Sequence, residues 1–259
     1  NRTSPFAFTG NKFEFRMPGS SFNIACTNIM LNTAVAESLR VFADELEGAS
    51  DLEAALTALV RRELAAHRRI IFNGNGYSKE WEEEAARRGL LNLRSTPDAL
   101  PLYTSEKNVS LFTRHGVYTL EEMKSREEIG LEEYNKTIHI EAETMLRMIS
   151  RQILPACLDY SGKLASSAAV KAGLGIDAAT EKALVSEISA KSSELAAAQS
   201  LLQTKTDGVP EDVHEAAAYY HAEVIPAMEK ARTAADSLEL LVGKESWPFP
   251  VYEDILFYV

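Results

Sequence analysis

The chain has 259 residues, a formal net charge of −11, and 46% hydrophobic against 25% charged residues. These proportions are ordinary for a soluble globular protein of one large or two smaller domains. The excess of negative charge argues against nucleic acid or an anionic membrane as a partner, and no apolar run approaches the roughly 20 residues that cross a bilayer.

Cysteine usage points to a reducing compartment. Cys26 and Cys157 are the two cysteines, and both lie in apolar stretches with no metal-type spacing between them. We therefore expect buried free thiols in a cytoplasmic protein.

The N-terminal stretch predicts a short strand followed by a helix. Residues 12–17 alternate charged with apolar side chains, and this period of two puts Lys12, Glu14 and Arg16 on one face of a strand. A helix is predicted from about Thr27 to Glu47. Its expected inward side chains are Ile29, Leu31, Val35, Leu39, Phe42 and Leu46.

A second helix is predicted from Asp51, a good N-cap residue, to Arg69. Its expected apolar side consists of Leu52, Leu56, Leu59 and Leu64. Residues 73–78 are rich in glycine and asparagine, which is typical of a tight turn. Ser78 is expected to cap a short helix that ends at Gly89.

From Thr119 onward the pattern becomes purely helical. Thr119 and Glu122 form a capping box that opens a helical region reaching about Ala169. We expect this region to bend near Gly130 and Pro155.

Two further helices complete the prediction, one from Asp177 to about Thr204 and one from Glu211 to about Val242. The stripe of the first is Leu184, Ile188, Lys191, Leu195, Ala198 and Leu202. The apolar residues of the second recur at alternating spacings of four and three, namely Val213, Ala217, Tyr220, Val224, Ala227, Ala231, Ala234, Leu238 and Leu241. This heptad pattern predicts a long antiparallel bundle, followed by an extended aromatic tail at residues 247–252.

The charged strand face has two interpretations. Lys12, Glu14 and Arg16 could form a solvated sheet face whose charge pairs contribute little to stability. Alternatively, Glu14 could be a Mg²⁺ or Mn²⁺ ligand, flanked by cations that bind substrate anions. Arg2, close by in the sequence, would add to such an anion site.

Several segments resemble the glutamine synthetases. Asn1-Arg2-Thr3-Ser4 followed by Lys12-Phe13-Glu14-Phe15-Arg16 resembles that family's N-R-S/T-x segment and its strand of the form basic-x-E-x-R. The form that these two motifs take in this chain is similar to that of the large type III branch of the family. Four later segments also resemble that branch, namely residues 70–78, 95–101, 140–145 and 247–248.

The resemblance implies a fold class that is mainly α with a short β element. Residues 1–118 would be the end of a glutamine synthetase catalytic domain, truncated at its N-terminus, and residues 119–259 a helical bundle with an aromatic tail. Because the chain opens at Asn1 inside the first motif, we expect a C-terminal fragment of a larger enzyme. The family's other metal ligands match nothing here, so we expect the fragment alone to be inactive. The family also implies a homo-oligomer, as a hexameric ring or stacked rings.

The resemblance also implies residue roles in ATP-dependent ligation of ammonia to glutamate through γ-glutamyl phosphate. Glu14 would bind the metal, Mg²⁺ or Mn²⁺, and Arg16 would hold glutamate. Arg2 would stabilise the transferring phosphoryl group, and Lys12 would contact the ATP phosphates. Ala7 stands where common members have a second arginine.

Two classes of function stay open at this stage. One is the ligase, and the other is an assembly or regulator-binding module made by the helical bundle. His115, His139, His214 and His221 are not clustered in the sequence. The His139/Glu143 and His214/Glu215 pairings match no known metal motif, so we expect solvated helix faces there.

Overall fold

The structure is a computed structural model, and it describes residues 6–8, 12–15, 19 and 23–256. The described residues form two compact units. The first contains those up to Arg94 together with 101–126, and the second contains 95–100 and those from Glu127 on. The family resemblance predicts that a catalytic domain ends at residue 118. That boundary is a different quantity from the division into compact units, and it stays a prediction.

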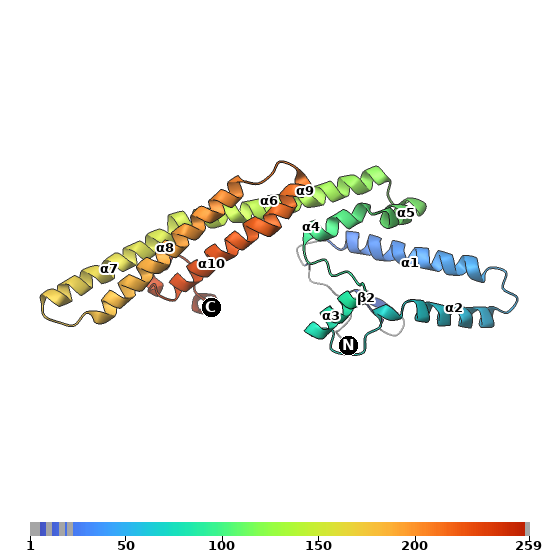
Figure 1. Cartoon of the computed structure of the whole chain (residues 1–259), viewed down its shortest axis with the longest axis horizontal. Helices are drawn as coiled ribbons and strands as arrows, with labels where there is room; N and C mark the ends of the chain where they lie inside the picture. The colour runs from blue at the N-terminus through green and yellow to red at the C-terminus, as the bar shows by residue number, and fades with distance from the viewer. Residues whose placement is uncertain (1–5, 9–11, 16–18, 20–22, 257–259) are drawn as a thin grey trace. The chain divides into compact units, whose positions relative to one another are not determined.

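The first unit combines one small antiparallel sheet with helices (Figure 1). Strand β1 is Phe6–Phe8 and strand β2 is Phe13–Phe15, paired so that Ala7 lies opposite Glu14. The helical elements assigned to this unit are α1 (Ala25–Leu46), α2 (Leu52–Ala66), the 3₁₀ turn η1 (Arg68–Ile70), α3 (Lys79–Arg87) and α5 (Glu106–Arg114). A further 3₁₀ turn, η2 (Leu100–Thr104), begins at the last residue of the 95–100 segment.

Helices α1 and α2 form where the sequence predicts them, but their apolar faces are largely exposed. Asp51 caps α2 as expected, because its carboxylate accepts a hydrogen bond from the Ala54 amide at 3.0 Å. The prediction that Val35 and Leu39 of α1 point inward is wrong, since both are exposed. On the predicted apolar side of α2, Leu59 is buried while Leu52, Leu56 and Leu64 are exposed.

A small core holds the end of the first unit together. Phe112 of α5 packs with Tyr118 and Met123, and all three side chains are buried. Arg126 lies over the Tyr118 ring at 4.5 Å, which is within the range of a cation–π contact.

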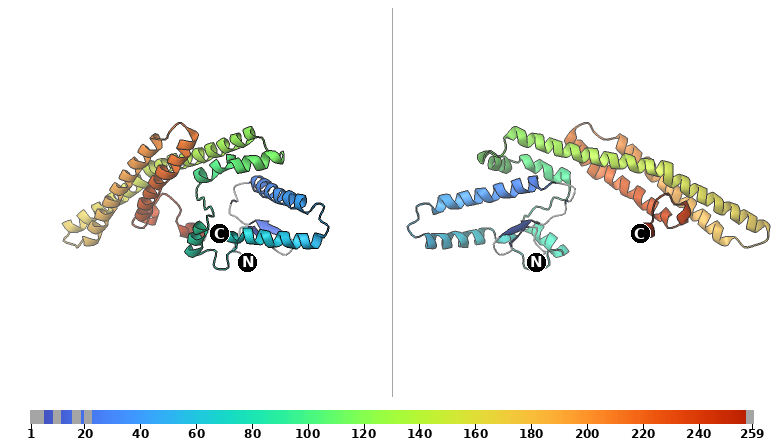
Figure 2. Two further views of the ribbon diagram at one scale, coloured as in Figure 1. Left: turned by 45° about the vertical axis from the view of Figure 1, so that its right-hand side comes forward. Right: turned by 180° about the vertical axis from the view of Figure 1, so that it is seen from behind.

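The second unit is a bundle of long helices. Its helices are α4 (Thr96–Ala99), α6 (Leu120–Met148, from Glu127 on), α7 (Leu154–Gly173), α8 (Ala179–Asp207), α9 (Val213–Tyr219), α10 (Ile225–Glu239) and α11 (Tyr252–Leu256). A 3₁₀ turn, η5, covers Lys244–Ser246. Helix α8 packs along α7 on one side and α10 on the other, and the views of Figure 2 show α6 leading directly into α7. Mainly helical architecture with a short β element is thereby confirmed.

The capping box at the start of α6 is also confirmed. The Thr119 amide donates to Glu122 Oε2 at 2.8 Å, and the Glu122 amide donates to Thr119 Oγ1 at 3.2 Å. Helix α6 runs unbroken through Gly130. The bend predicted there stays a prediction. Gly130 also has a packing role, because a Cβ at this position would lie 2.9 Å from Leu100 Cδ1.

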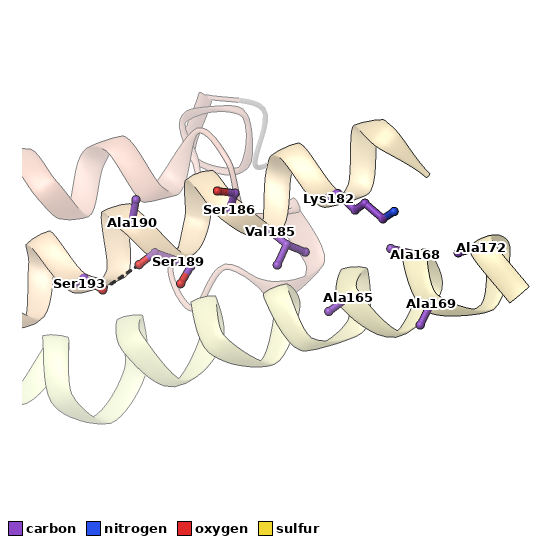
Figure 3. A pocket seen from close by; sticks show the side chains of 10 residues that line it. All are labelled: Ala165, Ala168, Ala169, Ala172, Lys182, Val185, Ser186, Ser189, Ala190 and Ser193. Carbon is purple, nitrogen blue, oxygen red and sulfur yellow. Dashed lines mark hydrogen bonds between the residues drawn. The ribbon is translucent and has the colours of Figure 1, made fainter. Parts of the chain in front are cut away.

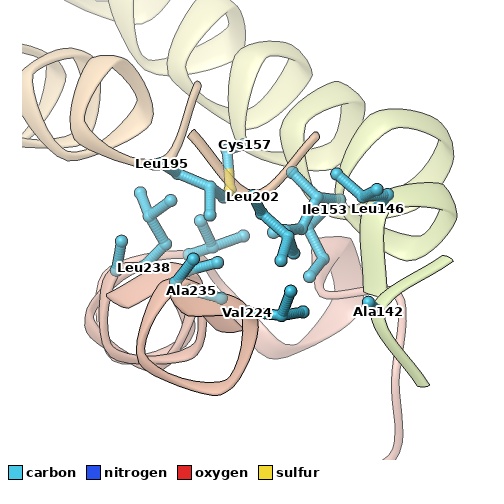
Figure 4. Packing of buried hydrophobic residues seen from close by; sticks show 14 of the residues in the cluster. Ala142, Leu146, Ile153, Cys157, Leu195, Leu202, Val224, Ala235 and Leu238 are labelled. Atoms are coloured by element: carbon cyan, nitrogen blue, oxygen red, sulfur yellow. The ribbon is translucent and has the colours of Figure 1, made fainter. Parts of the chain in front are cut away.

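The core of the second unit follows the predicted heptad. The buried residues of the last long helical stretch include Ala217, Tyr220, Val224, Ala227, Ala231, Ala234 and Leu238, all drawn from the predicted seam. Figure 4 shows Val224 and Leu238 facing Leu195 and Leu202 of α8 across this core. On α8, Lys191 belongs to the predicted stripe but lines a surface groove, whereas its neighbour Ser192 is buried.

Two π-helical turns interrupt the bundle, and each directly precedes a proline-containing helix. The turn η3 (Ile149–Ile153) leads into α7 with Pro155, and η4 (Tyr220–Val224) leads into α10 with Pro226. Proline lacks an amide hydrogen and its ring collides with the carbonyl four residues earlier. The wider π turn accommodates this collision without ending the helix.

The C-terminal tail and the cysteines complete the fold. Trp247 and Phe249 pack against the bundle core, which confirms that aromatic residues fix the tail.

Cys157 is buried, and burial raises the pKa of its thiol to about 11. Cys26 is exposed, so the expectation that both thiols are buried is wrong for this residue. Within the described ranges, no helix is both long and apolar enough to cross a membrane.

Candidate functional site

Two of the four predicted metal and substrate residues, Lys12 and Glu14, belong to the described part of the chain around strand β2. Glu14 is the central residue of β2 and is half-buried, opposite Ala7 of β1. Lys12 directly precedes β2 and is exposed. Arg2 and Arg16 lie outside the described residues. The assignment of these four side chains to one site therefore stays a prediction.

One carboxylate does not make a metal centre. Nowhere in the described part of the chain do three or more His, Cys, Asp or Glu side chains converge as metal ligands. Mg²⁺ prefers six oxygen ligands, several of them water or substrate oxygens. Glu14 can supply one of these oxygens, and the others must come from water, substrate or residues beyond those described.

A charge cluster that the sequence analysis missed joins α1 to α5. Glu37 of α1 accepts hydrogen bonds from Arg40 at 3.0 Å, from His115 Nε2 at 2.7 Å and from Arg114. These bonds, with Arg40 the largest contributor, lower the pKa of Glu37 to about 2. His115 is thus a hydrogen-bond partner of Glu37.

The glycine-rich turn at residues 73–78 sits beside a stack of three side chains. The Phe72 and Trp81 rings stack with centroids 4.2 Å apart, and the Arg88 guanidinium lies 5.6 Å from the Trp81 ring centroid. Arg88 also donates hydrogen bonds to the carbonyls of Arg69 and Ile71. These contacts tie the segment before the turn to α3.

In the second unit, a histidine and a tyrosine meet across the bundle. The Tyr220 hydroxyl lies 3.1 Å from His139 Nδ1, which joins the η4 turn to α6. Burial raises the pKa of Tyr220. His139 lies at an exposed position of α6, as expected, and its contact with Tyr220 adds a link to the bundle.

A shallow groove of about 650 Å³ runs between α7 and α8. Figure 3 shows that small side chains line it, with Ala165, Ala169 and Ala172 on α7 and Ser186 and Ser189 on α8. Lys182 lies at its outer end, and the Ser193 hydroxyl donates to the Ser189 carbonyl. The small side chains of this groove permit the close approach of another helix.

A second groove, of about 470 Å³, lies between α1 and α2 in the first unit. Exposed aliphatic side chains line most of it, including Leu56, Val60 and Leu64. Glu63 and His67 lie at its edge, 3.3 Å apart.

Comparison with known sequences identifies the class of protein. Residues 55–172 match the family described as "Glutamine synthetase C-terminal domain". The chain is therefore related to the glutamine synthetases and carries the C-terminal domain of that family, so the resemblance seen in the sequence is confirmed.

Three relatives extend the match to nearly the whole chain. A type-3 glutamine synthetase from Dictyostelium discoideum is 40% identical over 271 residues, covering 99% of this chain and 36% of the relative. Glutamine synthetases from Butyrivibrio fibrisolvens and Bacteroides fragilis are 38% and 34% identical, each covering 99% of this chain and 37% of the relative. The chain thus spans about a third of the length of the curated relatives it matches.

Proposed function

We propose that this chain serves as the C-terminal part of a cytoplasmic glutamine synthetase, an enzyme that joins ammonia to glutamate at the cost of ATP. The observation that carries the proposal is the 40% identity to a type-3 glutamine synthetase over 99% of the chain. Because the chain corresponds to about a third of that relative, we expect no ligase activity from these residues alone.

The β1–β2 hairpin is proposed to contribute to the metal and substrate site. Glu14 is half-buried on a strand whose pairing fixes its direction, which suits a carboxylate that must keep one position. Mg²⁺ or Mn²⁺, when bound, would neutralise charge on the ATP phosphates. Glu14 would hold that ion as one ligand among several.

The cations near Glu14 are proposed to bind the anionic reactants. Arg16 would hold the glutamate carboxylate through its planar guanidinium, and Arg2 would stabilise charge on the transferring phosphoryl group. Lys12, exposed at the start of β2, would contact the nucleotide phosphates as a point charge. These groups bind and orient, which is the main protein contribution to phosphoryl transfer.

The test uses a chimera in which this chain replaces the matching third of the Dictyostelium discoideum type-3 glutamine synthetase. The Glu14→Gln variant should lose at least about 100-fold in glutamine formation, since removing even the outer partners of metal ligands costs about 10–100-fold. Glu53→Gln, an exposed carboxylate in the first turn of α2, is the matched control and should leave the rate unchanged. Near-normal turnover of the Glu14→Gln chimera would refute the assignment.

A second candidate function, assembly, is favoured by the second unit. This unit has a continuous core of its own and presents an open groove of small side chains between α7 and α8. We propose that a helix of another subunit or of a regulator binds there, as part of a homo-oligomer of one or more rings.

The assembly proposal is tested by filling the groove. In the chimera, Ala169→Trp should reduce the assembled mass measured by sedimentation velocity, whereas Ser167→Trp, on the opposite face of α7, should not. An unchanged mass for Ala169→Trp would exclude an interface between subunits at this groove. Binding of a regulator would then be examined with the same pair of variants.

A further inference from the structure

The first unit has too little core to account for its own folding. Among the described residues, its buried hydrophobic side chains are Leu59, Phe112, Tyr118 and Met123. The second unit, in contrast, contains the large continuous core that includes Leu195 and the heptad seam. Small units that bury so few side chains usually need a partner, a metal or disulfides to be stable.

The missing core has an identifiable place on the first unit. Leu56, Val60 and Leu64 recur every four residues along α2 and are about half exposed, at 47%, 48% and 58%. Ile70 and Ile71 continue the same groove beyond the end of α2. We call these five residues the α1–α2 apolar face.

Some charged side chains beside the α1–α2 apolar face contact one another within the chain. Arg62 bonds to Glu45 at 2.6 Å and to Glu63 at 2.9 Å, while Glu63 lies 3.3 Å from His67. The face itself consists of aliphatic side chains, so it offers a partner apolar contact. Permanent interfaces have this character, whereas transient ones are more polar.

The length of the relatives indicates the occupant. This chain matches over 99% of its length, yet covers only 36–37% of each relative, so each relative has far more residues outside the match than inside it. We propose that the α1–α2 apolar face is the docking site for the portion of the glutamine synthetase polypeptide outside this match, and that the first unit completes its core there. This inference rests on the proposed function.

Thiol labelling distinguishes the docked face from a free one. Val60→Cys places a thiol on the face, and Ala58→Cys places one on the opposite side of α2 as a matched control. Both are made in a Cys26→Ser background, because Cys26 is exposed; Cys157 is buried and needs no replacement. Maleimide modification of each site is followed by mass spectrometry of the α2 peptide.

In the 259-residue chain alone, both thiols should react at similar rates. In the chimera with the Dictyostelium discoideum enzyme, the Val60→Cys site should react about tenfold or more slowly, because labelling then requires local opening. The Ala58→Cys site should change by less than about twofold. Equal labelling of both sites in the chimera would overturn the proposal.

Two further outcomes separate the alternatives. If the Val60→Cys site is already protected in the isolated chain, and that chain sediments as a dimer, a second copy covers the face and the proposal is wrong. The labelling does not depend on turnover. A Glu14→Gln chimera that makes glutamine at a near-normal rate and still protects the Val60→Cys site would therefore contradict the assigned chemistry of Glu14 while supporting docking at this face.

Discussion

The stability of the second unit should depend steeply on Leu195. This side chain is 0% exposed and lies in the bundle core between α8 and its neighbours. Leu195→Ala removes three buried carbon atoms, worth about 2.5 kcal/mol in lost transfer free energy. The cavity left behind raises the expected cost to about 3–5 kcal/mol.

Urea unfolding followed by helical circular dichroism at 222 nm measures this cost. The matched control is Leu240→Ala, because Leu240 is the same residue type and is 87% exposed. The control should change the free energy of unfolding by less than about 0.5 kcal/mol. Similar effects for the two variants would refute the assignment of α8 to the core.

Three other predictions follow from individual contacts. The pKa of Glu37 is lowered to about 2, so its ion pairs should stabilise the contact between α1 and α5 fully above about pH 4.5 and lose this effect towards pH 2. The protection factors of the α1 and α5 amides in hydrogen exchange should fall over this pH range, and Glu37→Gln should lack this pH-dependent part of the protection. Gly74→Ala should disturb Trp81 fluorescence, because a Cβ there would lie 2.6 Å from a Phe72 ring carbon; Gly162→Ala, where nothing lies within 4 Å, should not. Thr119→Ala should cost about 1 kcal/mol in the free energy of unfolding through loss of the cap on α6.

The helical bundle could be predicted from the sequence because its determinants are local. The seam through Ala217, Val224 and Leu238 follows from residue spacing alone, and so does the capping box at Thr119. The π turns could not be predicted in the same way. A proline inside a helical pattern either ends the helix or is accommodated by a wider turn, and at Pro226 the structure has the wider turn.

The candidate site and the first unit show what local patterns omit. The Glu37–Arg114 pair joins residues 77 positions apart, so no short window of sequence contains it. Leu39 and Leu64 follow a helical period, yet both side chains are exposed. The period locates the apolar side of a helix and does not say what packs against that side. For Lys12 and Glu14, spacing predicted a shared strand face, while their chemical roles come from family resemblance alone.

The alanine-rich seam of α10 has a consequence for the response to heat. Ala227, Ala231, Ala234 and Ala235 are buried, and each carries a single methyl group. Unfolding this helix therefore exposes less apolar area per residue than unfolding a leucine-rich one, and the heat-capacity increment scales with that area. Calorimetry of the chain should give an increment below the usual ~12–15 cal/mol/K per residue. A smaller increment flattens the curve of free energy against temperature, so the bundle should hold a nearly constant stability over a wide thermal range.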